Sequence, residues 1–257
     1  MQNKYWFLLA GLGLGNMPLA NDLESPPLSP HHTVIDTQKR LQDKISHAIT
    51  AFEQTPREDW SFRLTRHENE EGDITSSIEI FNPTKAAHER WTLLRSNGEI
   101  PNQKQIRKYI KGKQKGAKNS EEQGVSMRLR DIVQLESLQL TSEDEMFINA
   151  SFEVSLVQLG EEAAKHLKGT LTYVKEQAFI ERIVIVNTAP FSPMFSAKIT
   201  DFTLSFRFTK INAAILRRQH DLSMKGSFAF FTEIDEVSKD VFSDYKYVGQ
   251  SIAKQPN

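Results

Sequence analysis

The most regular alternation of apolar and polar positions lies in residues 197–209. From residue 202 to 208, large apolar side chains occupy every second position, and polar side chains lie between them. The apolar set is Phe202, Leu204, Phe206 and Phe208. Because the side chains of a strand alternate between two faces, this pattern predicts a β-strand with one buried and one solvated face. An antiparallel sheet that is covered on one side has this pattern.

Similar alternation on both sides of this segment predicts further strands. We expect them at residues 58–66, 74–80, 89–95, 146–156, 169–175, 178–187, 215–225, 226–232 and 242–248. Charged residues at 67–73 and the pair Asn97-Gly98 are typical of turns between strands. Short connections of this kind predict an antiparallel β-meander.

Two segments allow two interpretations each. Residues 126–140 fit a helix in their first part and a strand in their second part. Residues 190–195 form an apolar loop with Phe191, Met194 and Phe195, which would be a liability if exposed. This loop is either a lip over a cavity or a plug in the core.

Helical spacing is found in two segments. Residues 36–52 place apolar side chains at intervals of three and four, with Asp36 able to cap the first turn. The apolar stripe is Leu41, Ile45, Ala48, Ile49 and Phe52, and only the sheet is large enough to bury it. A second helix is expected in residues 101–124, opened by Pro101.

The N-terminal residues 1–20 have the features of a secretory signal peptide. Lys4 precedes an uncharged and mostly apolar run of 11 residues at 5–15, and Ala20 marks the expected cleavage site. The run is shorter than the ~20 apolar residues that cross a bilayer. The alternative is a retained N-terminal anchor. Because the segment is similar to bacterial export signals, we expect a soluble protein of the Gram-negative periplasm.

The proline-containing residues 21–35 are expected to form a flexible lead, followed by a single domain at residues 36–250 that contains a helical insert at about 101–124. The composition, 39% hydrophobic and 25% charged, is typical of a globular protein. The net charge of −1 gives no global attraction to nucleic acid.

No sequence motif for catalysis is present. The chain has no cysteine, no glycine-rich phosphate loop, no GxSxG elbow and no HExxH zinc motif. Its 7 histidines are scattered, and the pairs His31-His32 and Glu162/His166 supply too few ligands for a metal site. We therefore expect neither an enzyme nor a cofactor nor a metal.

The helical insert carries a run of basic residues without an acidic one. Its members are Lys104, Arg107, Lys108, Lys111, Lys113, Lys115 and Lys118. Such a run contacts an anionic surface, for example lipid headgroups, or is simply a solvated and mobile loop. For contact with an anionic surface, the candidate residues are Lys104, Arg107, Lys108, Lys111 and Lys115.

The layout resembles the periplasmic lipoprotein-carrier superfamily of the LolA and LolB type, in an uncharacterised proteobacterial exported branch. The similar stretches are the helix at 36–52, the WSFRL strand, the segment FNPTKAAHERWTLLRSNGEIP and the meander at 146–248. The resemblance implies an α+β fold, in which a strongly curved antiparallel β-meander forms an incomplete barrel. An N-terminal helix and a helical insert would cover it. The basic run at 104–118 departs from the short carrier proteins.

If the resemblance holds, the aromatic face lines a cavity for acyl chains. The ligand-binding candidates are Phe202, Leu204, Phe206, Phe208, Phe228 and Phe230. The alternative is that these residues form a filled core under the helices. We thus expect a non-enzymatic binding protein for a lipid, an acyl chain or a lipoprotein. The alternative is an envelope structural or assembly protein that contacts a protein or the membrane surface through the basic insert.

Overall fold

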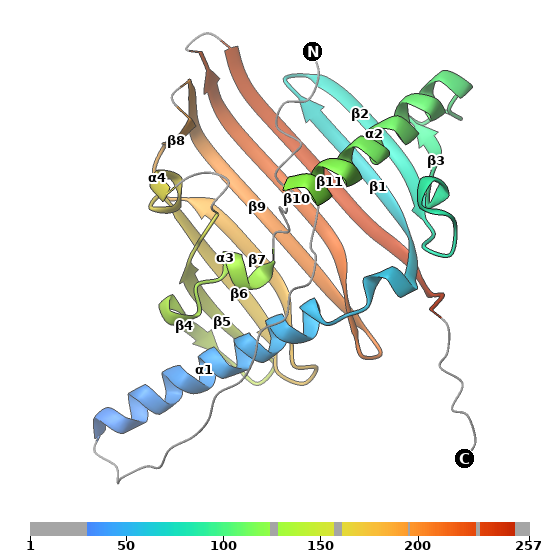
Figure 1. The fold of residues 1–257 in the computed structure, drawn as a ribbon. Helices are drawn as coiled ribbons and strands as arrows, with labels where there is room; N and C mark the ends of the chain where they lie inside the picture. Colours follow the sequence, from blue (N-terminus) through green and yellow to red (C-terminus); the bar gives the residue numbers. More distant parts are fainter. Residues whose placement is uncertain (1–29, 124–127, 157–160, 195, 230–231, 250–257) are drawn as a thin grey trace, which may run out of the picture.

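The computed structural model describes residues 30–123, 128–156, 161–194, 196–229 and 232–249. The expected signal peptide at 1–20 and most of the expected lead lie outside these ranges. One antiparallel sheet of 11 strands organises the molecule (Figure 1). Its strands follow the order β3-β2-β1-β11-β10-β9-β7-β6-β5-β4, and β8 pairs with β9 beside this path. Because β3 and β4 remain edges, the sheet does not close.

The strands range from short edge strands to three long central ones. They are β1 (Trp60–Glu70), β2 (Asp73–Phe81), β3 (Trp91–Ser96), β4 (Gln139–Glu143), β5 (Phe147–Glu153), β6 (Leu167–Val174), β7 (Phe179–Asn187), β8 (Phe191–Met194), β9 (Ala197–Ile211), β10 (Ala214–Phe228) and β11 (Thr232–Tyr247). The α-helices are α1 (Pro30–Glu53), α2 (Gln103–Gln123), α3 (Leu129–Ile132) and α4 (Glu161–Ala164). Short 3₁₀ turns lie at Arg57–Asp59, Ala87–Glu89 and Leu135–Ser137.

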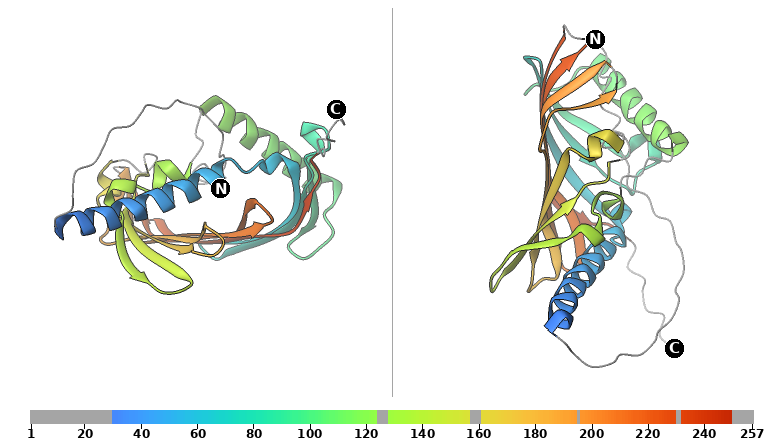
Figure 2. Two further views of the ribbon diagram at one scale, coloured as in Figure 1. Left: turned by 90° about the horizontal axis from the view of Figure 1, so that it is seen from below. Right: turned by 90° about the vertical axis from the view of Figure 1, so that its left-hand side faces the viewer.

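The sheet is curved, and α1 and α2 lie on its concave side (Figure 2). We call this side the inner face. The apolar stripe of α1 is buried as expected, and Phe52 of α1 contacts Phe208 of β9 with ring centroids 4.7 Å apart. The main hydrophobic core therefore lies between α1 and the inner face of the second half of the sheet.

The expected strand at 197–209 is confirmed as β9, and its alternating burial follows the sequence pattern. Two expectations for the neighbouring strands were wrong. The strand expected at 226–232 is not a separate strand, because residues 226–228 form the end of β10. β11 begins at Thr232, whereas a strand was expected only from residue 242. The first ten residues of β11 carry polar side chains on both faces of the strand. Their sequence therefore lacks the alternation of apolar and polar residues that predicts a strand.

The helix expected from residue 36 begins at Pro30, and the last six residues of the expected lead are helical. Proline fits the first helical position because its φ angle is already helical and the missing N–H is not needed there. The second helix begins at Gln103 as expected. Asn102 caps it: its Oδ1 accepts from the N–H groups of Lys104 and Gln105, each at 3.0 Å, and Gln105 Oε1 accepts from Asn102 N–H.

Residues 126–140 are helical in one part and extended in another, because the segment contains α3 and the start of β4. Both interpretations of this segment are therefore correct in part.

Phe191 of the apolar loop is buried, with 4% of its surface exposed, and lies in β8. The core-plug interpretation is thus confirmed for Phe191, whereas Phe195 lies outside the described residues. Among the described helices, none combines the length and the apolar character that crossing a membrane requires.

Candidate functional site

A continuous row of six aromatic rings crosses the inner face from β9 to β3. We call it the ring belt, and its members are Phe206, His220, Phe242, Phe62, Phe81 and Trp91. Consecutive ring centroids are 4.8, 5.5, 5.6, 5.1 and 5.0 Å apart. These separations lie in the range in which aromatic pairs attract each other. Each ring comes from a different strand.

Strand register explains how these rings meet. His220 lies opposite Phe206, and Phe62 lies opposite Phe81, which in turn lies opposite Trp91. Directly opposed residues project their side chains to the same face of a sheet. The pairing of β1 with β11 joins the two halves of the belt, because it places the first strand of the chain beside the last one.

The six aromatic and aliphatic residues expected to line a cavity have different positions. Four of them, Phe202, Leu204, Phe206 and Phe208, lie in the core cluster on β9 and are 3–7% exposed. Phe228 on β10 is partly buried and packs against that cluster. Phe230 lies outside the described residues.

Beyond β9, the inner face is only partly covered. Leu222 and Met224 of β10 pack against the core but keep part of their surface exposed. The belt residues Phe62, Phe81 and Trp91 are also intermediate in burial. The apolar surface of the inner face thus extends from the buried core to positions that a ligand can contact.

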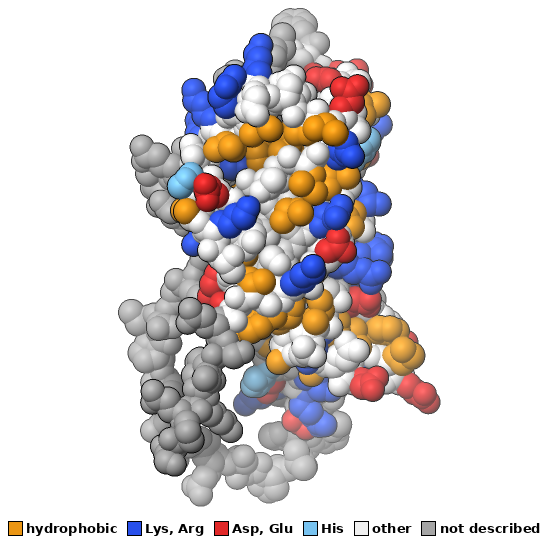
Figure 3. Space-filling view, turned by 90° about the vertical axis from the view of Figure 1, so that its right-hand side faces the viewer, with side chains coloured by type: hydrophobic (Ala, Val, Ile, Leu, Met, Phe, Trp, Pro, Cys, Tyr) orange, Lys and Arg blue, Asp and Glu red, His pale blue; other side chains and the backbone are white. Residues whose placement is uncertain are grey.

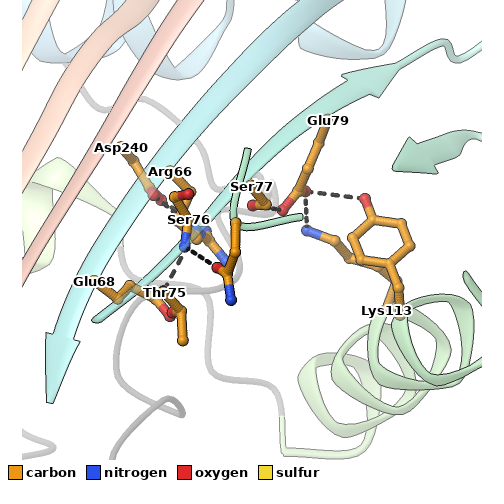
Figure 4. A network of polar contacts seen from close by, with 10 residues as sticks. Arg66, Glu68, Thr75, Ser76, Ser77, Glu79, Lys113 and Asp240 are labelled. Atoms are coloured by element: carbon orange, nitrogen blue, oxygen red, sulfur yellow. Dashed lines mark hydrogen bonds and ion pairs between the residues drawn. The ribbon is translucent and has the colours of Figure 1, made fainter. Parts of the chain in front are cut away.

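Charged side chains lie beside the ring belt on β1, β2 and β11 (Figure 4). Arg66 and Asp240 are opposed in register and form a two-pronged ion pair, with Nε–Oδ1 and Nη2–Oδ2 distances of 2.7 Å. Arg66 Nε is also 3.6 Å from Glu68 Oε1. Burial raises the pKa of Glu68 to about 7, although the positive charge of Arg66 acts in the opposite direction.

The carboxylate of Glu79 attaches α2 to the inner face. Its side chain is 3% exposed, and it accepts hydrogen bonds from Tyr109 Oη at 2.9 Å and from Ser77 Oγ at 2.8 Å. Lys113 Nζ lies 2.6 Å from Glu79 Oε2 and 4.0 Å from the centre of the Trp91 ring. Burial acts to raise the pKa of Glu79, but Lys113, Arg66 and the hydrogen bonds outweigh it and lower this pKa.

Lys113 therefore differs from the other basic residues of α2. The five candidates for surface contact, Lys104, Arg107, Lys108, Lys111 and Lys115, are exposed. Within the described part of the chain, none of them forms an ion pair with a carboxylate. The side chain of Lys118 lies outside the described residues. Seen from the β3 side, Lys and Arg side chains are interspersed with apolar and polar ones (Figure 3).

Two further arginines lie at the other border of the belt. The guanidinium of Arg57 lies 4.0 Å above the Phe52 ring, and its Nη2 donates to Phe52 O at 2.8 Å. Arg217 lies opposite Phe208, the ring that contacts Phe52. The Nε atoms of both arginines are buried without a hydrogen-bond partner in the described structure. Burial and the charge of Arg217 lower the pKa of Arg57 to about 10.

His220 is a neutral member of the belt. Burial lowers its pKa well below the ordinary value, and the nearby charges of Arg217 and Arg66 act in the same direction. Its edge-on contacts with Phe206 and Phe242 are those of a packed aromatic ring. Among the described residues, no group of three His, Asp or Glu side chains is arranged to hold a metal ion.

A separate pocket of about 630 Å³ lies on the outer side of α1, against the connection of β6 and β7. Most of the residues that line it are of polar or charged types, and they include Arg40, Lys44, His47 and Tyr173. His47 Nδ1 is 2.7 Å from Asp43 O, one turn earlier in the same helix. Its described lining residues include no convergent set of catalytic groups.

The sequence matches no protein-family model and no curated protein. Among solved structures, the chain is similar to a DUF1329 family protein from Desulfovibrio piger, with 9% sequence identity and a TM-score of 0.35. The similarity covers 84% of this chain and 95% of that chain. A likeness of this degree assigns neither a family nor a function.

Sequence reasoning identified the apolar side of β9 but missed the ring belt and its charged borders. Phe62 and Trp91 were placed in strands, yet nothing in their local sequence says that β1 pairs with β11. Arg217 and His220 interrupt the apolar pattern of β10. Leu222 and Met224 project inward, and side chains two positions apart on a strand share a face. This period would have placed His220 on the inner face as well.

Proposed function

We propose that the protein is a non-enzymatic binding protein for a hydrophobic ligand, which it holds on the inner face of the sheet. The observation that supports this is the partly exposed apolar surface formed by the ring belt with Leu222 and Met224. Contiguous apolar surface that is left uncovered inside a curved sheet is typical of a binding site for an apolar molecule. Burying each methylene of an acyl chain there contributes about 0.8 kcal/mol.

The proposal also covers the fold, an incomplete barrel, and the cell compartment, the periplasm. An unclosed curved antiparallel sheet with helices on its concave face is consistent with the incomplete barrel of the lipoprotein-carrier superfamily. The signal-like residues 1–20 favour export to the periplasm of a Gram-negative cell. A lipid, an acyl chain or a lipoprotein is the class of ligand that this setting supplies.

The direct test is native mass spectrometry of protein purified without detergent, combined with uptake of a fluorescent fatty acid. We expect a bound mass that organic solvent extracts as lipid, or saturable uptake of the probe. Leu222→Lys and Met224→Lys each place a charge on the inner face and should abolish uptake. Val237→Lys places the charge at an exposed position of β11, 40% exposed, and should not. An apo mass without probe uptake would contradict the proposal.

A second candidate function is contact with an envelope protein or an anionic membrane surface through α2. The supporting observation is that different residues of this helix have different contacts. Tyr109 and Lys113 hold the helix to Glu79. The five exposed basic residues form no ion pair with a carboxylate in the described part of the chain. A helix attached in this way presents a fixed basic face.

Charge reversal separates this candidate from the first. Lys108→Glu, Lys111→Glu and Lys115→Glu together should abolish sedimentation with vesicles that contain phosphatidylglycerol. Reversal of three exposed lysines on the sheet, Lys168, Lys198 and Lys239, is the matched control. Equal sedimentation of both triple variants and the wild type would exclude membrane contact through α2.

A further inference from the structure

Two arginines at the border of the ring belt, each with an Nε atom that lacks a partner in the described structure, suggest which end of a ligand binds there. Arg217 Nε and Arg57 Nε are buried and have no hydrogen-bond partner among the described residues. Buried polar atoms in folded proteins are almost always hydrogen-bonded, so that each exception requires an explanation such as a bound ion or ligand. Two positive charges brought together without a counter-charge are more costly than a single unpaired donor.

The carboxylates near the two arginines either form ion pairs with other residues or are exposed to solvent. Glu53, at the end of α1, forms an ion pair with Arg130 of α3. Asp240 forms the two-pronged pair with Arg66, at 2.7 Å, and Glu58 is exposed. Neither Arg57 nor Arg217 forms an ion pair with a carboxylate in the described part of the chain.

Tyr245 forms a hydrogen bond to the backbone of Arg217, and it does not neutralise the pair. Its hydroxyl donates to the Arg217 carbonyl oxygen at 2.6 Å. Burial raises the pKa of Tyr245, so that the phenol stays uncharged at physiological pH. The hydrogen bond fixes the backbone of β10 at this point and leaves the guanidinium available.

The fold holds both arginines on rigid elements. Arg57 lies in the 3₁₀ turn that connects α1 to β1, and its side chain is stacked on Phe52. Arg217 precedes a β-bulge in β10, where the register shifts between Arg217 and Gln219. The bulge lets Arg217 face inward beside Phe208, while the intervening Arg218 is exposed.

We propose that Arg57 and Arg217 bind the anionic head group of an amphiphilic ligand whose apolar part lies along the ring belt. This inference rests on the proposed function, because it requires an apolar ligand on the inner face. A guanidinium matches the planar carboxylate or the oxygens of a phosphate, and it donates several hydrogen bonds in a fixed fork. The ligand class is therefore a fatty acid or a lipid with an anionic phosphate head.

The experiment compares two probes that share one chain: the fluorescent fatty acid parinaric acid and its uncharged methyl ester. At pH 8, the wild type should bind the acid about tenfold or more tightly than the ester, as expected for hydrogen bonds to a charged group. Arg217→Met should remove this preference while ester binding persists. Arg218→Met, which removes the exposed neighbouring charge, should leave the preference unchanged.

Arg217→Lys keeps the charge but lacks the fork, and should retain only part of the preference. This variant also serves if Arg217→Met does not fold, which circular dichroism would reveal. Equal binding of acid and ester to the wild type would overturn the head-group site and leave the hydrophobic carrier intact. Binding of neither probe would overturn both proposals.

A free anion is distinguished from a head group by inorganic phosphate. If phosphate raised the melting temperature of the wild type but not that of Arg217→Met, and the acid had no advantage over the ester, the pair would bind a free anion. That result would overturn the head-group assignment. Phosphate that competes with the acid but not with the ester would support it, because both anions would then occupy the same arginines.

Discussion

Tyr109 and Glu79 are joined by a hydrogen bond of 2.9 Å between the phenolic hydroxyl of α2 and the carboxylate of β2. The carboxylate also receives Lys113, one turn further along α2. Because Glu79 is 2% exposed, the orientation of a largely polar helix depends on one buried acidic residue. The inner face thus combines an apolar ring belt with charged contacts that fix the elements around it.

We predict that Glu79→Gln lowers the free energy of unfolding by about 3 kcal/mol, because it leaves the partly buried Lys113 without its counter-charge. Urea unfolding followed by circular dichroism measures this change, and hydrogen exchange of the α2 amides shows whether the helix separates from the sheet first. Glu99→Gln, at an exposed position after β3, is the control. Unchanged unfolding and unchanged exchange in Glu79→Gln would refute the role of Glu79.

Glu68 should make stability depend on pH. Its pKa of about 7 in the folded state lies above the ordinary value of 4.5, so the folded state holds a proton that the unfolded state has released between these two values. Stability should therefore fall as pH rises through this window, by about 2–3 kcal/mol for a side chain that is 13% exposed.

Glu68→Gln should remove this part of the pH dependence and raise stability at pH 8. Urea denaturation at pH 5 and pH 8 compares the variant with the wild type and with Glu233→Gln, an exposed position of β11. If wild type and Glu68→Gln lost the same stability between the two pH values, the burial of Glu68 would not have the effect described.

Arg217→Met should stabilise the ligand-free protein by about 1–3 kcal/mol. It replaces a largely buried charge, which has no ion-pair partner in the described part of the chain, by an apolar side chain of similar length. The hydrogen bond from Tyr245 persists, because it is made to the backbone carbonyl of residue 217. Thermal unfolding of delipidated protein provides the measurement. A strong loss of stability would instead indicate that Arg217 has a structural role.

Gly169 on β6 lies directly opposite Phe152 on β5, and its missing side chain makes room for the phenyl ring. A Cβ atom at residue 169 would lie 2.2 Å from Phe152 Cζ. Because Phe152 is 1% exposed and tightly packed, Gly169→Ala should cost about 1–3 kcal/mol. Gly112→Ala, in α2 with no atom within 4 Å of the new Cβ, should be neutral or stabilising by up to about 1 kcal/mol. Chemical denaturation of the pair checks the contrast, which equal effects would contradict.

The sequence predicts those elements in which burial follows local periodicity. The apolar stripe of α1 and the alternation of β9 are both found as expected, because each buries one face against the core. β11 was recognised only in part, since its inward positions include Glu236, Ser238 and Asp240, which follow no apolar period. A strand whose inward-facing residues are polar lacks the apolar alternation by which strands are predicted from sequence.

The candidate site was less predictable than the fold. The ring belt joins Phe62 and Phe242, which meet only because β1 pairs with β11. The arginine pair likewise joins the end of α1 to a bulge in β10. Contacts between such distant segments depend on strand order, and strand order is not encoded in any local pattern.

The central claim is that the inner face binds an apolar ligand, and methyl NMR of methionine tests it most directly. Met224 lies half-buried on the inner face, whereas Met146 is 62% exposed between β4 and β5 and serves as an internal control. On titration of delipidated protein with a fatty acid, we predict saturable shifts of the Met224 methyl signal and none of Met146. A Met224 signal that stays in place at saturating ligand would contradict the account.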